Sequence, residues 1–135
     1  MCIFCKIINK EIPNYTVYED EYCLAFLDIH PCAKGHTVVI PKTHAEMLYE
    51  MSEMDYVRLA DGLRHAMNRV REALQPDGMN VGINIGHVAG QAVGHVHWHI
   101  IPRWEGDDGG SMHSIVRNPG DESAEEVAKK FTIIL

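Results

Sequence analysis

Three histidines stand at alternate positions in the stretch GHVHWHIIPR, residues 94–103. In a β-strand, side chains two residues apart point to the same face, roughly 6.6 Å from one another. The spacing therefore predicts that His95, His97 and His99 form a row of imidazoles on one face, with apolar side chains behind it. Near pH 7 a neutral imidazole is a nucleophile, a proton carrier and a metal ligand. A row of solvated imidazoles, or one that only binds a metal ion, are the alternatives.

A glycine-rich stretch runs directly into this row. GHVAGQAVG, residues 86–94, contains Gly86, Gly90 and Gly94, with Gln91 between the last two. Backbone without a Cβ can approach an anion closely, and its N–H groups can donate to phosphate oxygens. Such a loop by itself is often only a turn. Followed at once by potential nucleophiles, it favours chemistry at a phosphate group.

The N-terminus carries a second group of reactive side chains, the Cys-x-x-Cys pair of Cys2 and Cys5. This spacing brings two thiols together on one turn, whereas tetrahedral zinc takes four ligands. Because the sequence has no second cysteine pair at this spacing, two histidines must complete a zinc site if one forms. A redox pair and two unligated thiols are the alternatives.

The hydrophobic pattern predicts an α+β fold that positions these residues. Apolar residues recur every three or four positions over 52–74, which predicts one long helix, and Ser52 suits its N-terminus. A short helix or turn closed by Pro13 is expected near the N-terminus, and a short helix over 123–131. Period-two or apolar runs predict strands at 15–20, 22–28, 35–42, 79–86 and 94–103. With only one long helix among these strands, a mostly antiparallel sheet fits better than βαβ units.

Composition limits the class of protein. A chain of 135 residues is long enough for one domain and too short for two ordinary ones. Its formal net charge of −7, without a run of Lys or Arg, argues against a nucleic acid polymer as partner. We find neither a secretory signal nor an apolar run long enough to span a membrane. We therefore expect a cytoplasmic protein without a membrane partner, and cysteines that are thiols or metal ligands rather than disulfides.

Several of these stretches resemble the histidine triad (HIT) superfamily. HVHWHII resembles its His-φ-His-φ-His-φ-φ motif, and the similarity continues in IFCKIINKEIP, FLDIHPCAKGHTVVIPKTH and GINIGHVAGQAVGHVHWHIIPR. The resemblance covers about residues 2–104 and implies a single HIT domain over 1–135, with a loop and tail over 105–135 outside the matched part. It also implies a homodimer whose sheet continues across both chains. The implied activity is cleavage or transfer at the α-phosphate of a purine nucleotide through a covalent nucleotidyl-histidine.

The resemblance assigns roles to three histidines. His97, in the middle of the row, matches the family's nucleophile, whose tautomer is fixed by a backbone carbonyl of the neighbouring triad segment. His99 matches the residue that faces the α-phosphate or the bridging atom and helps to protonate the leaving group. His36, in GHTVVIPK, matches an additional active-site histidine, although a purely structural hydrogen-bonded histidine is the alternative.

The nucleotide-binding residues are matched in the same way. Asp28 matches the carboxylate that accepts hydrogen bonds from the ribose hydroxyls, with a solvated strand-end aspartate as the alternative. Asn84, Gly90 and Gln91 match the phosphate side of the site. Ala92 stands where relatives commonly carry Ser or Thr, so a hydroxyl near the leaving group is missing. The apolar cleft for the base is matched by four residues that could equally be ordinary core: Ile3, Phe4, Phe26 and Ile29.

The zinc-binding members of the family suggest the two missing metal ligands. In this sequence the implied set is Cys2, Cys5, His44 and His95. A zinc ion closed by four protein ligands has no open position for water, so its role would be structural. His95 would then be a metal ligand, whereas His97 and His99 would do chemistry.

The leaving group divides the family into nucleoside phosphoramidases and dinucleoside polyphosphate hydrolases. The ending HIIPRW resembles the polyphosphate branch, because Arg103 could bind phosphates beyond the scissile bond. IFCKIINKEIP resembles the phosphoramidase branch, and Arg103 could equally be solvated. We expect broad tolerance that leans toward dinucleoside polyphosphates. Two other classes remain open: a nucleotide-binding sensor with vestigial hydrolysis, and a hydrolase whose histidine row holds a catalytic metal ion.

Overall fold

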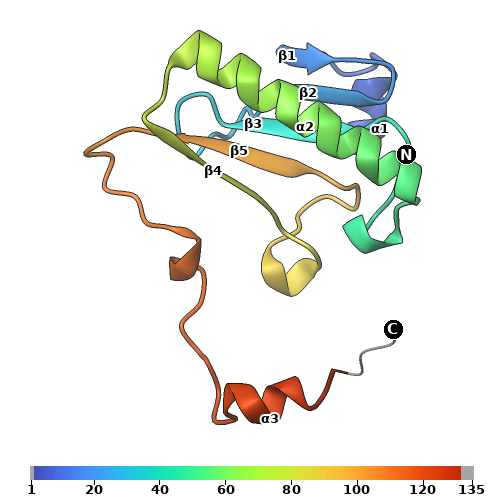
Figure 1. Cartoon of the computed structure of the whole chain (residues 1–135). Coiled ribbons are helices and arrows are strands. Elements are labelled where there is room, and N and C mark those ends of the chain that lie inside the picture. The colour runs from blue at the N-terminus through green and yellow to red at the C-terminus, as the bar shows by residue number, and fades with distance from the viewer. Residues whose placement is uncertain (1, 132–135) are drawn as a thin grey trace.

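The computed structural model describes residues 2–131, which form an α+β fold (Figure 1). Five strands make one antiparallel sheet in the order β1-β2-β3-β5-β4. The strands are β1 (Thr16–Glu19), β2 (Cys23–Leu27), β3 (Thr37–Pro41), β4 (Gly78–Ile83) and β5 (Trp98–Arg103). The helices are α1 (Ile3–Ile8), α2 (Glu53–Leu74) and α3 (Ala124–Ala128), with 3-10 turns at Leu48–Glu50, His87–Ala89 and Met112–Ser114. The predicted fold class is confirmed.

Helix α2 covers one face of the sheet, as Figure 1 shows. It begins where the sequence predicts, because the Ser52 hydroxyl accepts a hydrogen bond from the Asp55 N–H at 3.1 Å. Its apolar stripe is buried against the strands, with Leu59 and Ala66 in the same cluster as Val39 of β3. The helix is charged elsewhere, and among residues 2–131 no helix is both long and apolar enough to cross a membrane.

On the opposite face of the sheet, helix α1 packs against β2 and β3. The side chains of Phe4 and Ile7 on α1 pack against Phe26 and Val38 of β2 and β3. Helix α1 ends at Ile8, and Lys10 adopts a left-handed φ of 64°, so the helix ends before Pro13 is reached. The helix thus covers β2 and β3, while the histidines lie beside it, toward β5.

The predicted strand over 94–103 is shorter than expected and begins only at Trp98. His95 and His97 therefore lie in the segment that precedes the strand, which corrects the prediction of three histidines on one strand. The sheet register pairs Val39 with Trp98, and its continuation would place Val96 opposite Pro41, which has no N–H to donate. The Val96 N–H instead donates to the carbonyl of Ala45 at 2.8 Å.

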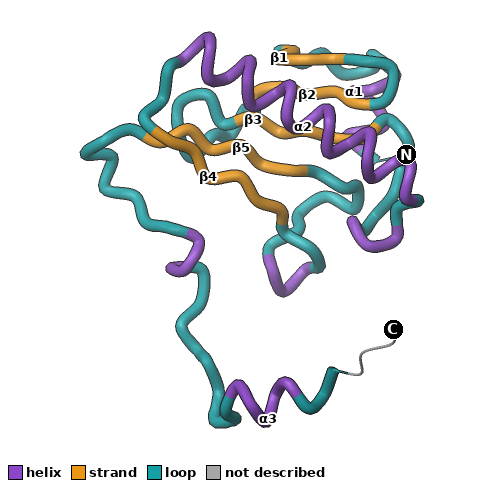
Figure 2. The backbone as a smooth tube through the Cα atoms, in the orientation of Figure 1, coloured by secondary structure: helices purple, strands orange, loops and turns teal. Residues whose placement is uncertain are grey.

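Strand β4 also ends earlier than predicted, at Ile83, which pairs with Trp98 at the start of β5. Asn84 consequently lies just beyond the sheet, at the beginning of the glycine-rich loop. After β5 the chain leaves the sheet, and residues 107–115, which include a 3-10 turn, line a cavity together with β4 and β5. The short helix α3 lies farther out, away from the sheet (Figure 2). The predicted helix over 123–131 is reduced to Ala124–Ala128, capped by Ser123.

Candidate active site

His97 is held in one orientation by the backbone of its own segment. Its Nδ1 atom lies 2.8 Å from the carbonyl oxygen of His95, so Nδ1 carries the proton and donates it to this oxygen. The ring is buried and packs edge-on against the ring of Phe4, with 5.2 Å between the centroids. This arrangement leaves the Nε2 lone pair of His97 available for attack on an electrophile.

His36 and His99 form a hydrogen-bonded pair whose tautomers follow from the contacts. The Cys32 N–H donates to Nδ1 of His36 at 3.2 Å, so His36 carries its proton on Nε2. That proton is donated to Nδ1 of His99, 2.9 Å away. His99 therefore carries its own proton on Nε2, which is buried and has no partner within residues 2–131. A buried N–H without an acceptor is costly, and a phosphate or leaving-group oxygen or nitrogen would satisfy it.

Burial keeps both rings of this pair neutral. It is the main cause that lowers the pKa of His99 to about 4, and the neighbouring His97 and His36 act in the same direction. Burial also lowers the pKa of His36, although Asp28 opposes the effect. At pH 7 both rings of the pair are therefore uncharged.

Asp28 follows β2, and its carboxylate interacts electrostatically with His36 of this pair. Its Oδ2 lies 3.8 Å from Nε2 of His36, and its Oδ1 accepts the His30 N–H at 2.8 Å. The carboxylate is partly exposed, which leaves it accessible to a hydroxyl donor. Asp28, His36 and His99 also place three potential ligand atoms within 4.8 Å of one another.

The glycine-rich loop is built as the sequence suggests, but Gln91 does not point out of it. Gly86 and Gly90 have φ angles of 88° and 100°, which disfavour other residues. The Gln91 side chain accepts the Gly86 N–H at 2.8 Å and donates to the carbonyls of Glu46 and Val93 at 2.8 and 3.1 Å. The amide of Gln91 is therefore engaged in holding the loop.

The four apolar residues expected in the base cleft divide into two pairs. Phe4 and Phe26 are buried and touch each other edge-on, with 5.7 Å between the centroids, so they belong to the core. Ile3 and Ile29 are exposed. The Phe4 ring nevertheless borders His97, so this part of the core is in contact with the candidate nucleophile.

Arg103 binds other residues of this chain rather than standing free. Its Nε and one Nη donate to the two carboxylate oxygens of Asp107, both at 2.8 Å. The other Nη donates to Oδ1 of Asn80 at 2.7 Å and to the carbonyl of Gly110. The guanidinium holds the pKa of Asp107 well below its usual range. These partners occupy the guanidinium group of Arg103, which we expected to bind phosphates.

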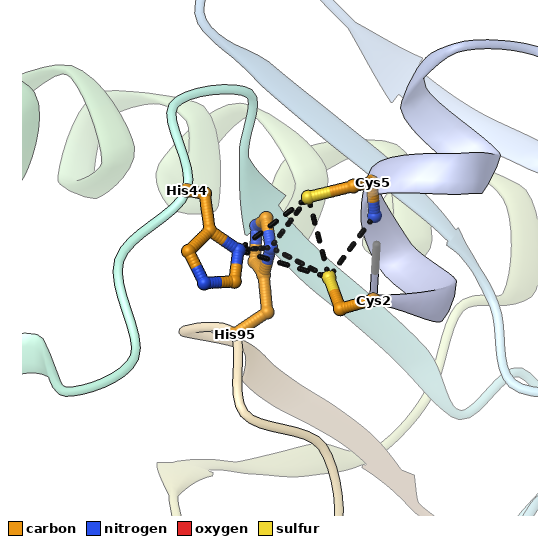
Figure 3. A group of neighbouring side chains, drawn as sticks. All are labelled: Cys2, Cys5, His44 and His95. Carbon is orange, nitrogen blue, oxygen red and sulfur yellow. Dashed lines mark hydrogen bonds between the residues drawn. The ribbon is translucent and has the colours of Figure 1, made fainter.

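Figure 3 shows Cys2, Cys5, His44 and His95 pointing toward a common centre. They come from the start of α1, the loop after β3 and the segment before β5. The six distances between their sulfur and Nδ1 atoms range from 3.0 to 3.7 Å. Ligand atoms about 2.0–2.3 Å from a tetrahedral metal ion lie roughly 3.3–3.8 Å apart, so these residues could hold one. Nε2 of His95 donates to the Pro41 carbonyl at 2.9 Å, which frees Nδ1 for a metal ion.

A cavity of about 670 Å³ lies beside His36 and His99, and no sequence motif predicted it. Part of its lining comes from residues 107–115, which lie outside every motif that we recognised. Asn84 also lines this cavity, so the structure does place it near His99. The tail lacks a periodic pattern that could have predicted this packing.

Comparison with known proteins settles the family. The family model described as HIT domain matches residues 9–106. The chain belongs to the HIT family. Its HIT domain is 42% identical to a HIT family protein from Bacillus subtilis of known crystal structure, with a TM-score of 0.83 over 96% of this chain and 91% of the other.

Two further HIT proteins bear on chemistry. An adenosine 5′-monophosphoramidase from Schizosaccharomyces pombe is 46% identical over 102 residues, which are 76% of this chain and 74% of the relative. A zinc-bound histidine triad protein from Mycobacterium smegmatis is 41% identical, with a TM-score of 0.74 over 79% of this chain and 78% of the other. Membership of a family with such relatives supports nucleotide hydrolase activity for this HIT domain.

Proposed function

We propose that this HIT protein hydrolyses purine nucleotides at the α-phosphate through a nucleotide bound covalently to His97. The observation that carries the proposal is that a free ring nitrogen of His97 lies near a ring N–H of His99. The Nδ1–H of His97 donates to the His95 carbonyl, which frees Nε2 for attack. The ring centroid of His99 lies 5.0 Å from that of His97, and the Nε2–H of His99 has no partner in the described part of the chain. A nucleophile next to a hydrogen-bond donor suits displacement at phosphorus.

The first step forms a bond from Nε2 of His97 to phosphorus while the bond to the leaving atom breaks. As the bond breaks, the leaving atom keeps that electron pair and takes the Nε2 proton of His99. The hydrogen-bonded pair of His36 and His99 takes up one proton from the solvent for this transfer, so after it the pair is neutral again beside the cationic nucleotidyl-imidazolium of His97. In the second step water attacks phosphorus, His97 leaves as a neutral imidazole, and the water gives one proton to the pair, which releases it to the solvent.

The nucleotide is proposed to lie along the residues that the sequence suggests. Asp28 would accept hydrogen bonds from the ribose hydroxyls, and its partly exposed carboxylate beside His36 supports this role. Ile3 and Ile29 offer exposed apolar surface for the purine base near Phe4 and Phe26. Gly90 and Asn84 would lie on the phosphate side, while Gln91 holds the loop there.

For the leaving group we now favour an amine over a polyphosphate. The ties of Arg103 to Asp107 and Asn80 weaken the argument for a polyphosphate. The relatives named adenosine 5′-monophosphoramidase, 44% and 46% identical, support cleavage of a phosphorus–nitrogen bond.

Zinc is our proposal for the group of Cys2, Cys5, His44 and His95. Two thiolates and two imidazoles suit zinc better than harder cations, and the near-tetrahedral spacing fits the ion. All four positions around the ion would be taken by protein, so its contribution is to fix the N-terminal segment against the residues before β5.

A homodimer completes the proposal. On the side away from β5, strand β4 pairs with no other strand of the described part of the chain. An unpaired edge can extend the sheet into a second copy. Light scattering of the purified protein should give about twice the mass of one chain, and the mass of a monomer would contradict this assembly.

Mass spectrometry of protein quenched during turnover tests the mechanism. Incubation with adenosine 5′-phosphoramidate should add one adenylyl group to the peptide that contains His97, and His97→Ala should remove it. Turnover would also distinguish an enzyme from a nucleotide-binding sensor. Absence of the adduct in an active enzyme would contradict the covalent mechanism.

A metal-dependent hydrolase is the second candidate, because Asp28, His36 and His99 place three ligand atoms close together. In that case a chelator should abolish activity, and His97→Ala should retain activity that depends on added metal. The covalent mechanism predicts the opposite result for His97→Ala.

A further inference from the structure

The cavity beside His36 and His99 lies on the sheet face opposite α2 and is lined by β4, β5 and residues 107–115. We call it the tail cavity. Phe4, which borders His97, and Phe26, which packs against Phe4, are not among its lining residues, so the cavity is distinct from the surface proposed for the purine base. His99 therefore stands between two regions, one toward α1 and one toward the tail.

Space inside the tail cavity comes from a missing side chain. Gly82 is paired with His99 across β4 and β5, so a side chain there would stand beside the His99 imidazole. A Cβ at this position would lie 3.3 Å from the terminal methyl group of Met112. The tail therefore passes directly over the open position next to His99.

The cavity holds little free charge. Arg103 is bound by both carboxylate oxygens of Asp107, which neutralises its guanidinium locally. The other cation in the lining is Lys34, whose ammonium group lies 5.8 Å from the ring centroid of Trp104. A leaving group with several phosphate charges would find few partners here.

Apolar side chains at the rim remain in contact with water. Met112 and Ile115 are 54% and 74% exposed although both line the cavity. Ile101 and Trp104 add apolar and aromatic surface to the lining. Contact with an apolar ligand would remove part of this surface from water, which is favourable.

We propose that the tail cavity binds the leaving amine of the substrate, and that this amine carries a bulky apolar or aromatic group. The inference rests on the proposed function. When the bond between phosphorus and the leaving nitrogen breaks, that nitrogen keeps the electron pair, takes the proton of His99 and departs on the side of the tail. Met112 and Ile115 determine specificity for the amine. Because the HIT match ends at residue 106, this specificity belongs to a segment outside the family model.

Two substrates with leaving amines of similar basicity test the proposal: the N-methyl and the N-(2-phenylethyl) derivatives of adenosine 5′-phosphoramidate. The intact protein should favour the phenylethyl substrate about tenfold or more in kcat/KM. The double variant Met112→Ala/Ile115→Ala should lose most of this preference, with hydrolysis of the N-methyl substrate unchanged within about twofold. Gly82→Val should fill the space beside His99 and also reduce the preference.

Val116→Ala is the matched control, since Val116 is adjacent, exposed and absent from the cavity lining. It should keep the preference of the wild type. Equal rates for the two substrates, or a preference that survives the double variant, would overturn the proposal. If neither substrate is hydrolysed and His97 acquires no adenylyl group, the proposed function itself fails, which is a different outcome.

Discussion

Two groups of side chains meet in the segment before β5, where His95 of the candidate metal-binding group lies two residues before His97 of the candidate catalytic group. The two groups differ in whether all of their hydrogen-bonding atoms have a partner. The candidate metal-binding group converges on one centre, with six distances of 3.0–3.7 Å between its sulfur and Nδ1 atoms, and His95 donates to the Pro41 carbonyl. In the candidate catalytic group a line of hydrogen bonds runs from the Cys32 N–H through His36 to His99, and it ends in an Nε2–H that has no partner among residues 2–131.

This difference distinguishes a group that would stabilise the fold from a group that would act on a substrate. A group whose donors and acceptors are all occupied stabilises a fold, whereas a preorganised donor without a partner is available to a substrate. The carbonyl of His95 joins the two groups, because it fixes the Nδ1 proton of His97. If the two groups act independently, changes in the catalytic group should lower turnover and changes in the metal-binding group should lower stability.

The largest effect is expected for His97→Ala. It removes the nucleophile, so kcat for adenosine 5′-phosphoramidate should fall roughly 10⁴-fold. Binding of adenosine 5′-monophosphate, measured by calorimetry, should change little because the ribose and phosphate contacts lie elsewhere. His65→Ala, which removes an imidazole on α2, is the control and should retain full activity. Comparable activity in the two variants would exclude His97 as the nucleophile.

Loss of the metal ion should mainly affect stability. Cys5→Ser should lower the zinc content and decrease the free energy of unfolding by about 3 kcal/mol or more, measured by denaturant titration. Activity of the folded fraction should fall by less than tenfold. Cys32→Ser, which changes a thiol outside the group, should keep one zinc ion per chain. A Cys5→Ser variant that keeps one zinc ion per chain would refute the ligand set.

His99→Gln should lower kcat by about 10²-fold for a phosphoramidate, because the leaving nitrogen then lacks a proton donor. The loss should be smaller for a substrate whose leaving group departs without a proton, such as a nitrophenyl ester. A similar loss for both substrates would indicate that His99 acts only through binding or structure.

The smallest effect concerns pH. The pKa of His99 is about 4 in the folded protein and near 6.5 when unfolded, so between these values the unfolded state binds more protons. The free energy of unfolding should therefore decrease by about 1–2 kcal/mol as pH falls from 7 to 5. Because His97, His36 and Asp28 surround His99, the comparison is with His99→Gln, which should show a smaller decrease. An equal decrease would assign the effect to other groups.

Local patterns in the sequence were sufficient for much of this protein. The stripe over 52–74 and the Ser52 cap depend on near neighbours in the chain, and α2 begins where they predict. Strand bounds were less predictable, because they depend on which partner is available across the sheet. The absent N–H of Pro41 is invisible from residues 94–103, and so the sequence placed His95 and His97 on a strand.

The sequence by itself determined the family and predicted the candidate reactive residues, because motif spacing is a local property. The group of Cys2, Cys5, His44 and His95 follows from the family resemblance, and the structure brings these four residues together. Only the tertiary structure directed the proton of His36 to His99 and bound Arg103 to Asp107. It also laid an unpatterned tail beside His99. These contacts depend on the closure of long loops and on side-chain packing, which residue spacing alone does not encode.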